Sequence, residues 1–191
     1  MTRLLVSPDT NAADILLDTD KPAEIAAALD TVGVSFEQWP VRDALAVQAS
    51  DADVLSAYAD DIARVRAAQG YDTVDVVRLR RADQSDDEWY ALASGARAKF
   101  LAEHIHSEDE VRFFVEGRGA FYLRLDGKIH VVVCERGDLL GVPAGTRHWF
   151  DMGTNPEFTA LRFFGDPEGW VGNFTGDDIA TRYPTFDSIT A

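Results

Sequence analysis

The sequence predicts a mainly β protein, a small β-barrel or β-sandwich that carries an N-terminal elaboration of helices and strands. Three observations lead to this fold class and to a single domain. From residue 103 onward, short alternating segments are broken by Gly, Asp and Pro, which is typical of antiparallel barrels and sandwiches. Before residue 103, segments with apolar residues at helical spacing alternate with short strand-like segments. The 191 residues contain no repeat and no Pro-, Gly- or Ser-rich linker.

Helices and strands are expected to alternate in the N-terminal half. The second helix has the clearest signals, because Ser50 precedes it, Gly70 follows it and its apolar residues lie on one helical face. That apolar face consists of Val54, Leu55, Tyr58, Ile62 and Val65. The expected helices lie within residues 20–33, 51–69 and 85–101, and the expected strands within residues 34–41 and 73–81.

Six short strands are expected in the C-terminal half, because apolar and polar residues alternate between turn signals. Asp126 and Gly127 separate two of these strands, and this dipeptide suits a two-residue hairpin turn. The expected strands lie at residues 111–117, 120–125, 128–133, 138–143, 146–151 and 158–164.

The acidic composition excludes some classes of partner. The chain has 33 acidic and 18 basic residues and a formal net charge of -15, which repels phosphate backbones and anionic membranes. We therefore expect no nucleic acid and no membrane partner, and we interpret most carboxylates as a solvated surface. Cys134 is the sole cysteine and is expected to be a small core residue. No secretory signal and no apolar run of roughly 20 residues is evident, so we expect a cytoplasmic protein.

His104 and His106 are the clearest candidate metal ligands. In an extended strand, residues two positions apart point to the same side, with backbones about 7 Å apart, so both imidazoles can reach one ion. Glu110 has the same parity, but a straight strand would place it roughly 13 Å beyond His106. A ligand bond is about 2 Å long. We therefore expect the chain to bend within "SEDE", residues 107–110.

A second cluster supplies the remaining candidate ligand, His148. Gly137, Pro143 and Gly145 precede it and predict a tight turn that brings its strand beside the first cluster. Three imidazole nitrogens and one carboxylate oxygen suit Fe, Ni, Mn or Co, with positions left open for substrate or oxygen, whereas structural zinc more often recruits cysteines. His130 is interpreted as an ordinary strand residue. The acids interpreted as solvated groups or as neighbours of the ligands are Glu103, Glu108 and Asp109.

These residues carry two motifs that resemble those of the cupin superfamily. The matching residues run from His104 to Gly117 in the first motif and from Gly137 to His148 in the second. Ala98 and Met152 depart from the usual glycine and asparagine, at positions that hold no metal. More specifically, "KFLAEHIHSEDEVRFFVEGRGAFYL", "GDLLGVPAGTRHWFDMG" and "GWVGNFTGDDIATRYP" are similar to the bacterial branch of the acireductone dioxygenase family of methionine salvage. The resemblance is dense from about residue 86 to the end.

The resemblance implies a monomeric cupin jelly-roll β-barrel that cleaves acireductone, 1,2-dihydroxy-5-(methylsulfanyl)pent-1-en-3-one, with dioxygen. With Fe2+ the family forms 4-(methylsulfanyl)-2-oxobutanoate and formate, and with Ni2+ it forms 3-(methylsulfanyl)propanoate, formate and carbon monoxide. We expect residues 1–100 to pack on a metal-binding core at residues 101–165, and residues 166–191 to cap the pocket. The implied ligands of one Fe2+ or Ni2+ ion are His104, His106, Glu110 and His148.

Four further residues are expected to shape the substrate site. Arg112 shares the inward face of Glu110, where its guanidinium would stabilise the anionic enediolate; the alternative is an ordinary ion pair with one of the many acids. Phe100, Phe150 and Trp170 match family positions that line the pocket and would suit the methylsulfanyl tail. For both phenylalanines the alternative is core packing. Two other functions stay open: another cupin metalloenzyme, such as an isomerase or a different oxygenase, and a cupin that binds a small ligand without catalysis.

Overall fold

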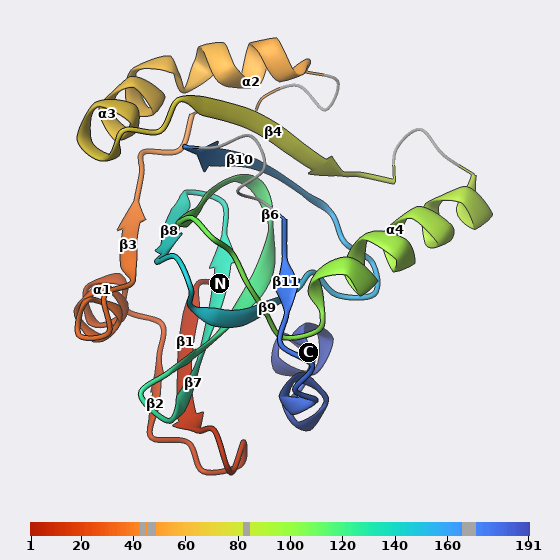
Figure 1. Cartoon of the computed structure of the whole chain (residues 1–191). Coiled ribbons are helices and arrows are strands. Elements are labelled where there is room, and N and C mark those ends of the chain that lie inside the picture. Colours follow the sequence, from red (N-terminus) through yellow and green to blue (C-terminus); the bar gives the residue numbers. More distant parts are fainter. Residues whose placement is uncertain (43–44, 46–48, 82–84, 166–170) are drawn as a thin grey trace.

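Antiparallel β-strands form the body of the protein in the computed structural model (Figure 1), which describes residues 1–42, 45, 49–81, 85–165 and 171–191. The strands form two sheets that share one long strand, which confirms the mainly β fold class. The strands are β1 (Arg3–Pro8), β2 (Leu17–Thr19), β3 (Ser35–Gln38), β4 (Thr73–Leu79), β5 (His104–Ile105), β6 (Glu110–Leu125), β7 (Lys128–Glu135), β8 (Asp138–Val142), β9 (Arg147–Asp151), β10 (Phe158–Phe164) and β11 (Asn173–Phe174).

Strand β6 links the two sheets. In one sheet the order is β11-β5-β9-β6-β7-β1-β2. In the other sheet β6 lies between β10 and β8, with β4 beyond β10 and β3 beyond β8. The strands β1 to β4, from the N-terminal half, are therefore part of the same two sheets as the C-terminal strands.

The course of β6 corrects a prediction from the sequence. The alternation predicts two strands, residues 111–117 and 120–125, whereas Glu110–Leu125 is a single strand of 16 residues. Its first half pairs with β8 and β10, and its second half pairs with β7 and β9. Gly117 lies between these halves with a φ of 72°, and a Cβ atom there would lie 1.9 Å from the carbonyl oxygen of Glu157. The glycine that resembles a strand end therefore lets one strand bend from one sheet into the other.

Strand β7 is paired on both edges. On one side, Asp126 and Gly127 have φ values of 50° and 70° and close the expected hairpin with β6. On the other side, β7 pairs with β1, where Leu4 faces Val132. Strand β1 was not predicted, because its apolar run of Leu4, Leu5 and Val6 is too short for periodicity to distinguish a strand from other structure. Cys134 on β7 is fully buried, as expected for a core residue.

The helices lie around the sheets, and one prediction about them is wrong. Residues 51–69 are predicted as a single helix, but the helix is broken at Tyr58, whose φ and ψ are −110° and 18°. The Tyr58 ring packs edge-on against Phe113, 4.9 Å between centroids, and apolar spacing alone cannot reveal such a break. Ser50 and Ser85 each begin a helix with a capping box. The helices are α1 (Pro22–Asp30), α2 (Asp51–Ala57), α3 (Ala59–Gln69), α4 (Asp86–Phe100), the 3₁₀ helix η1 (Ile179–Arg182) and α5 (Phe186–Ile189).

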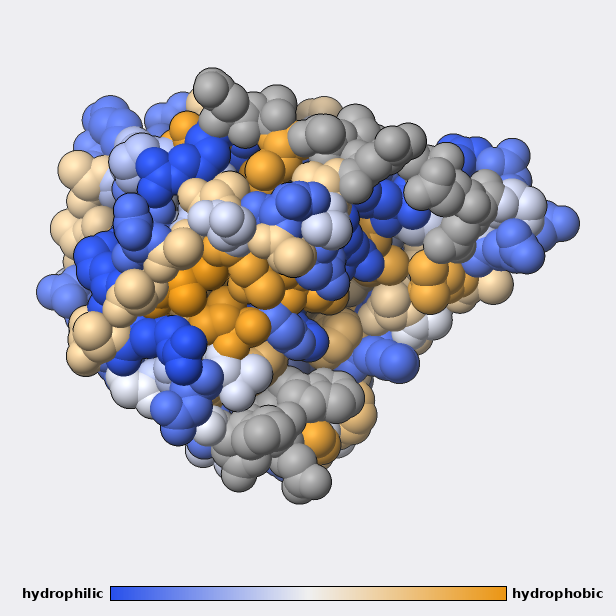
Figure 2. Space-filling model, turned by 90° about the horizontal axis from the view of Figure 1, so that it is seen from above, coloured by the Kyte–Doolittle hydropathy of each residue, from blue (hydrophilic) through white to orange (hydrophobic). Residues whose placement is uncertain are grey.

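Three clusters of buried side chains hold these layers together. The largest lies between the two sheets and includes Phe114 and Phe150. A second fixes α2 and α3 to the outer face of the β4-containing sheet, and a third lies between the other sheet and the C-terminal segment around Tyr183. Figure 2, seen from the side of α2, α3 and β4, shows apolar side chains gathered in the middle of that face and hydrophilic ones around them. Among the described residues, no helix has the length and apolar character needed to span a membrane.

Candidate metal centre

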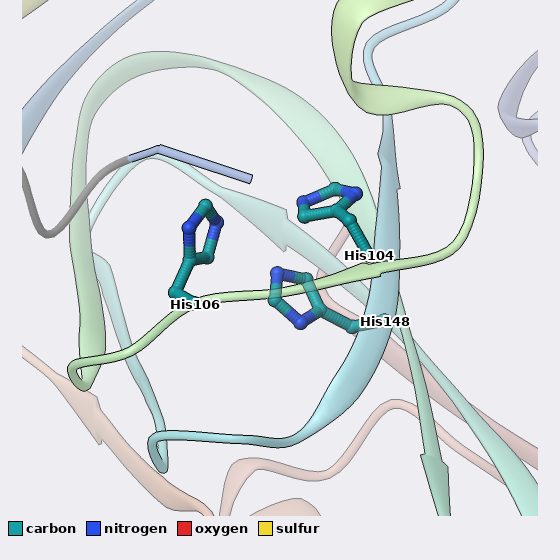
Figure 3. Close-up of side chains that lie close together, drawn as sticks. All are labelled: His104, His106 and His148. Carbon is teal, nitrogen blue, oxygen red and sulfur yellow. The ribbon is translucent and has the colours of Figure 1, made fainter. Parts of the chain in front are cut away.

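Three histidine side chains converge inside the barrel (Figure 3). His104 on β5 and His148 on β9 are direct partners in the sheet, and His106 follows β5. The rings offer nitrogen atoms that all lie within 4.8 Å of one another. The relative exposures of the three residues are 1%, 1% and 4% in the order named. This buried cluster is therefore small enough for one divalent ion to contact all three rings.

Glu110 reaches the same place because the chain bends between β5 and β6. The backbone N–H of Gly145 donates to the carbonyl of His106 at 2.9 Å, which ties the bend to the turn before β9. As a result, one carboxylate oxygen of Glu110 lies 2.8 Å from Nε2 of His148 and 3.5 Å from Nε2 of His106. A carboxylate oxygen and imidazole nitrogens thus face one another, as in a mixed metal-ligand set.

Backbone carbonyl groups determine which ring nitrogen of each histidine is available to a metal. A carbonyl oxygen can only accept a hydrogen bond, so the Nδ1 atom that faces it must carry the proton. The remaining Nε2 atom then keeps its lone pair for a metal. The three contacts are His104 Nδ1 to Ala102 O at 2.8 Å, His106 Nδ1 to Val171 O at 3.2 Å, and His148 Nδ1 to Thr146 O at 2.8 Å.

The protonation states in the cluster also suit a metal. Burial, followed by the neighbouring His148, lowers the pKa of His104 from 6.5 to about 4. Burial likewise lowers the pKa of His106. Burial would raise the pKa of Glu110, but the positive charge of Arg112 holds it well below its usual value. At neutral pH, His104 and His106 are therefore neutral and Glu110 is ionised, which are the forms that bind metals.

Arg112 forms an ion pair with Glu110. Its Nε and Nη2 atoms lie 2.8 and 2.6 Å from one carboxylate oxygen, while the other oxygen faces His148. The Arg112 and Glu110 side chains are only 12% and 9% exposed. The positive guanidinium thus balances the negative charge of the Glu110 carboxylate and orients it beside the histidines.

A cavity of about 130 Å³ extends between α4, β4 and the inner faces of the two sheets. Arg112, Phe100 and Phe150 line it together, and the ring of Phe100 lies 6.3 Å from that of His104. Trp170, the remaining predicted pocket residue, lies outside the described residues. The other lining residues are Val77, Arg78, Leu79, Ala96, Met152, Phe158 and Arg162.

Two of these lining residues, Arg78 and Arg162, were not identified from the sequence. Arg162 faces Arg112 in the register of β10 and β6. Strand parity could not have identified either residue. Residues of both parities are buried along β10, and the side chains along β4 are partly buried on both faces.

The other polar residues considered in the sequence are not members of the histidine cluster. Asp109 accepts hydrogen bonds from the backbone N–H of Ala144 and from the hydroxyl of Tyr71. Glu108 accepts one from the backbone N–H of Gly165. His130 is buried on β7, where it pairs with Leu123 of β6 and not with a member of the histidine cluster. Glu103 is buried and contacts the C-terminal segment, as described below.

Comparison with known proteins agrees with this geometry. The protein-family model described as "ARD/ARD' family" matches residues 4–172 of this chain. The chain belongs to the ARD/ARD' family. It is 56% identical to an acireductone dioxygenase of Parvibaculum lavamentivorans over 188 residues, 98% of each chain. It is 51% identical to acireductone dioxygenase 2 of Nocardia farcinica over 189 residues, 99% of this chain and 98% of the relative.

A solved structure of the same family has the same fold. The acireductone dioxygenase from Bacillus anthracis with a cadmium ion in its active centre is 29% identical, with a TM-score of 0.73. The match covers 91% of this chain and 98% of the other. It confirms the cupin-type fold predicted from the sequence. The metal in the active centre of that relative agrees with the metal-binding character of the three-histidine cluster.

Proposed function

We propose that this chain is a metal-dependent acireductone dioxygenase, which cleaves 1,2-dihydroxy-5-(methylsulfanyl)pent-1-en-3-one with dioxygen. The observation that carries the proposal is the buried cluster of His104, His106 and His148 in a member of the ARD/ARD' family. Relatives that share 56% and 51% of their residues with this chain over nearly its full length are named acireductone dioxygenases.

The proposed ligands are the three histidines through Nε2, together with the carboxylate of Glu110. Fe2+ or Ni2+, when bound, supplies a Lewis acid that holds the substrate enediol as its electron-rich anion. The backbone carbonyls that face the Nδ1 atoms fix the ring orientations. Arg112 keeps Glu110 ionised and directed at the histidines.

We further propose that Arg112 contacts the substrate. Its described contacts with Glu110 use Nε and Nη2, so Nη1 can donate to an anionic substrate oxygen in the adjoining cavity. Phe100 and Phe150 line that cavity, where they would receive the methylsulfanyl tail and exclude water. By resemblance to the family, Trp170 would complete this apolar wall and residues 166–191 would cap the pocket.

The metal is proposed to select the products. The Fe2+ form would yield 4-(methylsulfanyl)-2-oxobutanoate and formate for methionine salvage, and the Ni2+ form would yield 3-(methylsulfanyl)propanoate, formate and carbon monoxide. We propose that the enzyme acts as a cytoplasmic monomer, with residues 1–100, 101–165 and 166–191 as parts of one cupin domain.

The test is product analysis of protein loaded without oxygen with either metal. Acireductone and dioxygen are then supplied, and spontaneous oxidation is subtracted with a protein-free control. The expected products are the keto acid with Fe2+ and carbon monoxide with Ni2+, and neither should appear with His104→Ala. The proposal fails if both loaded forms leave acireductone unchanged, or if His104→Ala retains full activity.

A further inference from the structure

A short C-terminal segment, residues 171–175, crosses the metal centre, and we refer to it as the strap. Its strand β11 pairs with β5, so that Asn173 faces Ile105 and Phe174 faces His104. In Figure 3 the pale blue chain at the upper left passes close to the ring of His106. At Gly172 the strap lies directly against a candidate ligand, because a Cβ atom there would be 3.2 Å from Cδ2 of His104.

Among the three histidines, only His106 directs its Nδ1 atom to a carbonyl of the strap. His104 and His148 each direct Nδ1 to a carbonyl only two residues earlier in the chain. His106 instead directs Nδ1 to the carbonyl of Val171, which lies 65 residues later in the sequence. Local backbone geometry therefore sets the tautomer of two rings, whereas the tautomer of His106 depends on the position of the strap.

A buried carboxylate fixes the end of the strap. The hydroxyl of Thr175 donates to Oε2 of Glu103 at 2.6 Å, and its backbone N–H donates to the Glu103 carbonyl at 3.1 Å. Glu103 immediately precedes His104 and is 1% exposed. Nη1 of Arg124 donates to Oε1 of Glu103 at 3.3 Å and to Asp177 at 2.9 Å. The carboxylate thus joins the strap to the strand that carries the first ligand.

We propose that Thr175 and Glu103 are positioning residues of the metal centre. Their hydrogen bond seats the strap so that the Val171 carbonyl keeps the proton of His106 on Nδ1 and leaves Nε2 free for the metal. This inference rests on the metal centre of the proposed function. Loss of a partner that orients a ligand typically weakens metal affinity about 10- to 100-fold. Thr175→Val removes the hydroxyl with little change in volume, and we expect its effect on Ni2+ affinity to fall in that range.

The direct test is ¹⁵N NMR of the histidine side chains in metal-free protein, together with Ni2+ affinity from competition with a chelator. Wild type should show His106 protonated on Nδ1, and Thr175→Val should show a mixture of tautomers with weaker Ni2+ binding. Thr175→Ser keeps the hydroxyl and should restore both properties. Thr181→Val is the matched control, because that hydroxyl donates to the carbonyl of Asp178 and not to Glu103.

The proposal is overturned if Thr175→Val keeps the wild-type tautomer of His106 and the wild-type Ni2+ affinity. It is also overturned if Thr181→Val weakens Ni2+ binding as much as Thr175→Val. If Thr175→Val does not fold, Thr175→Ala supplies the test, because it removes the same hydroxyl from Glu103 without adding a methyl group in its place. Wild-type protein that binds no Ni2+ would refute the metal centre itself, and the NMR comparison in metal-free protein would still decide the role of the strap.

Discussion

Replacing Arg112 by methionine isolates the role of the buried ion pair beside the histidines. Methionine retains much of the aliphatic volume of arginine but leaves the Glu110 carboxylate without its cationic partner. Because the two side chains are 12% and 9% exposed, water can replace little of the lost interaction. We expect metal-free Arg112→Met to be less stable than metal-free wild type.

The expected size follows from the burial of this pair. Removing one partner of a buried ion pair costs about 3–5 kcal/mol, whereas an exposed pair contributes about 0–1 kcal/mol. In a protein of this size, 1 kcal/mol corresponds to about 2–4 °C in Tm, so the variant should melt roughly 6–20 °C lower. Arg3→Met is the matched control, because Arg3 and Asp18 form a similar pair whose side chains are 38% and 46% exposed.

The pH and metal dependences distinguish this electrostatic cost from a packing defect. The pKa of Glu110 is held below 4.5 in the folded protein, so its contribution to stability is present above that pH and is lost as the pH falls. The gap between wild type and Arg112→Met should therefore narrow in acid. Bound Ni2+ supplies a new positive neighbour for Glu110 and should narrow the gap at pH 7.

Urea unfolding followed by circular dichroism, with EDTA or with excess Ni2+, measures these free energies. Equal stability of metal-free Arg112→Met and wild type at pH 7 would refute the electrostatic explanation. If the loss of stability in Arg112→Met is independent of both pH and metal, its cause is a packing defect and not the lost ion pair.

Further outcomes are expected for substitutions at four residues. Gly117→Ala should lower the free energy of unfolding by at least about 2 kcal/mol, because its Cβ atom would lie 1.9 Å from the carbonyl oxygen of Glu157 at a positive φ. Gly95→Ala in α4 meets no atom within 4 Å and should be stabilising by about 0.5–1 kcal/mol; the reverse order in urea unfolding would contradict the strained turn at Gly117. Burial lowers the pKa of His104 from 6.5 to about 4 in the folded protein, so the unfolded chain binds this proton first and metal-free protein should lose about 3 kcal/mol of stability as the pH falls from 6.5 to about 4. His104→Gln should lack that loss in urea titrations at each pH. Phe100→Ala should raise KM for acireductone about 10-fold or more, since it removes an aromatic wall of the cavity, and an unchanged KM would place the substrate tail elsewhere.

The candidate ligands could be found from the sequence because strand geometry is regular. Parity places His104 and His106 on one side and shows that Glu110 needs a bend, and the structure contains this bend with Glu110 beside His148. Parity also places Arg112 with Glu110, but it cannot decide whether the guanidinium faces a substrate or the carboxylate. That choice depends on distances between side chains, which only the folded structure provides.

Other features have no signature in the sequence. The carbonyl of Val171 contacts His106 through the backbone, which every residue has, and the two residues are 65 positions apart. Gly117 has the composition of a strand end, yet it is a bend within one strand, because the obstacle to a Cβ atom is the distant residue Glu157. The helical spacing likewise gives no signal for the break at Tyr58, where the ring packs against the distant residue Phe113.

The most direct test of the central claim is dioxygen uptake with acireductone, measured together with the metal content of the same samples. Wild-type protein loaded with Fe2+ should hold one metal ion per chain and consume dioxygen well above the spontaneous rate. His148→Ala should lose both properties, because His148 contributes Nε2 to the cluster and lies beside Glu110. Full dioxygen uptake by metal-free wild type or by His148→Ala would contradict a metal-dependent dioxygenase at the three-histidine cluster.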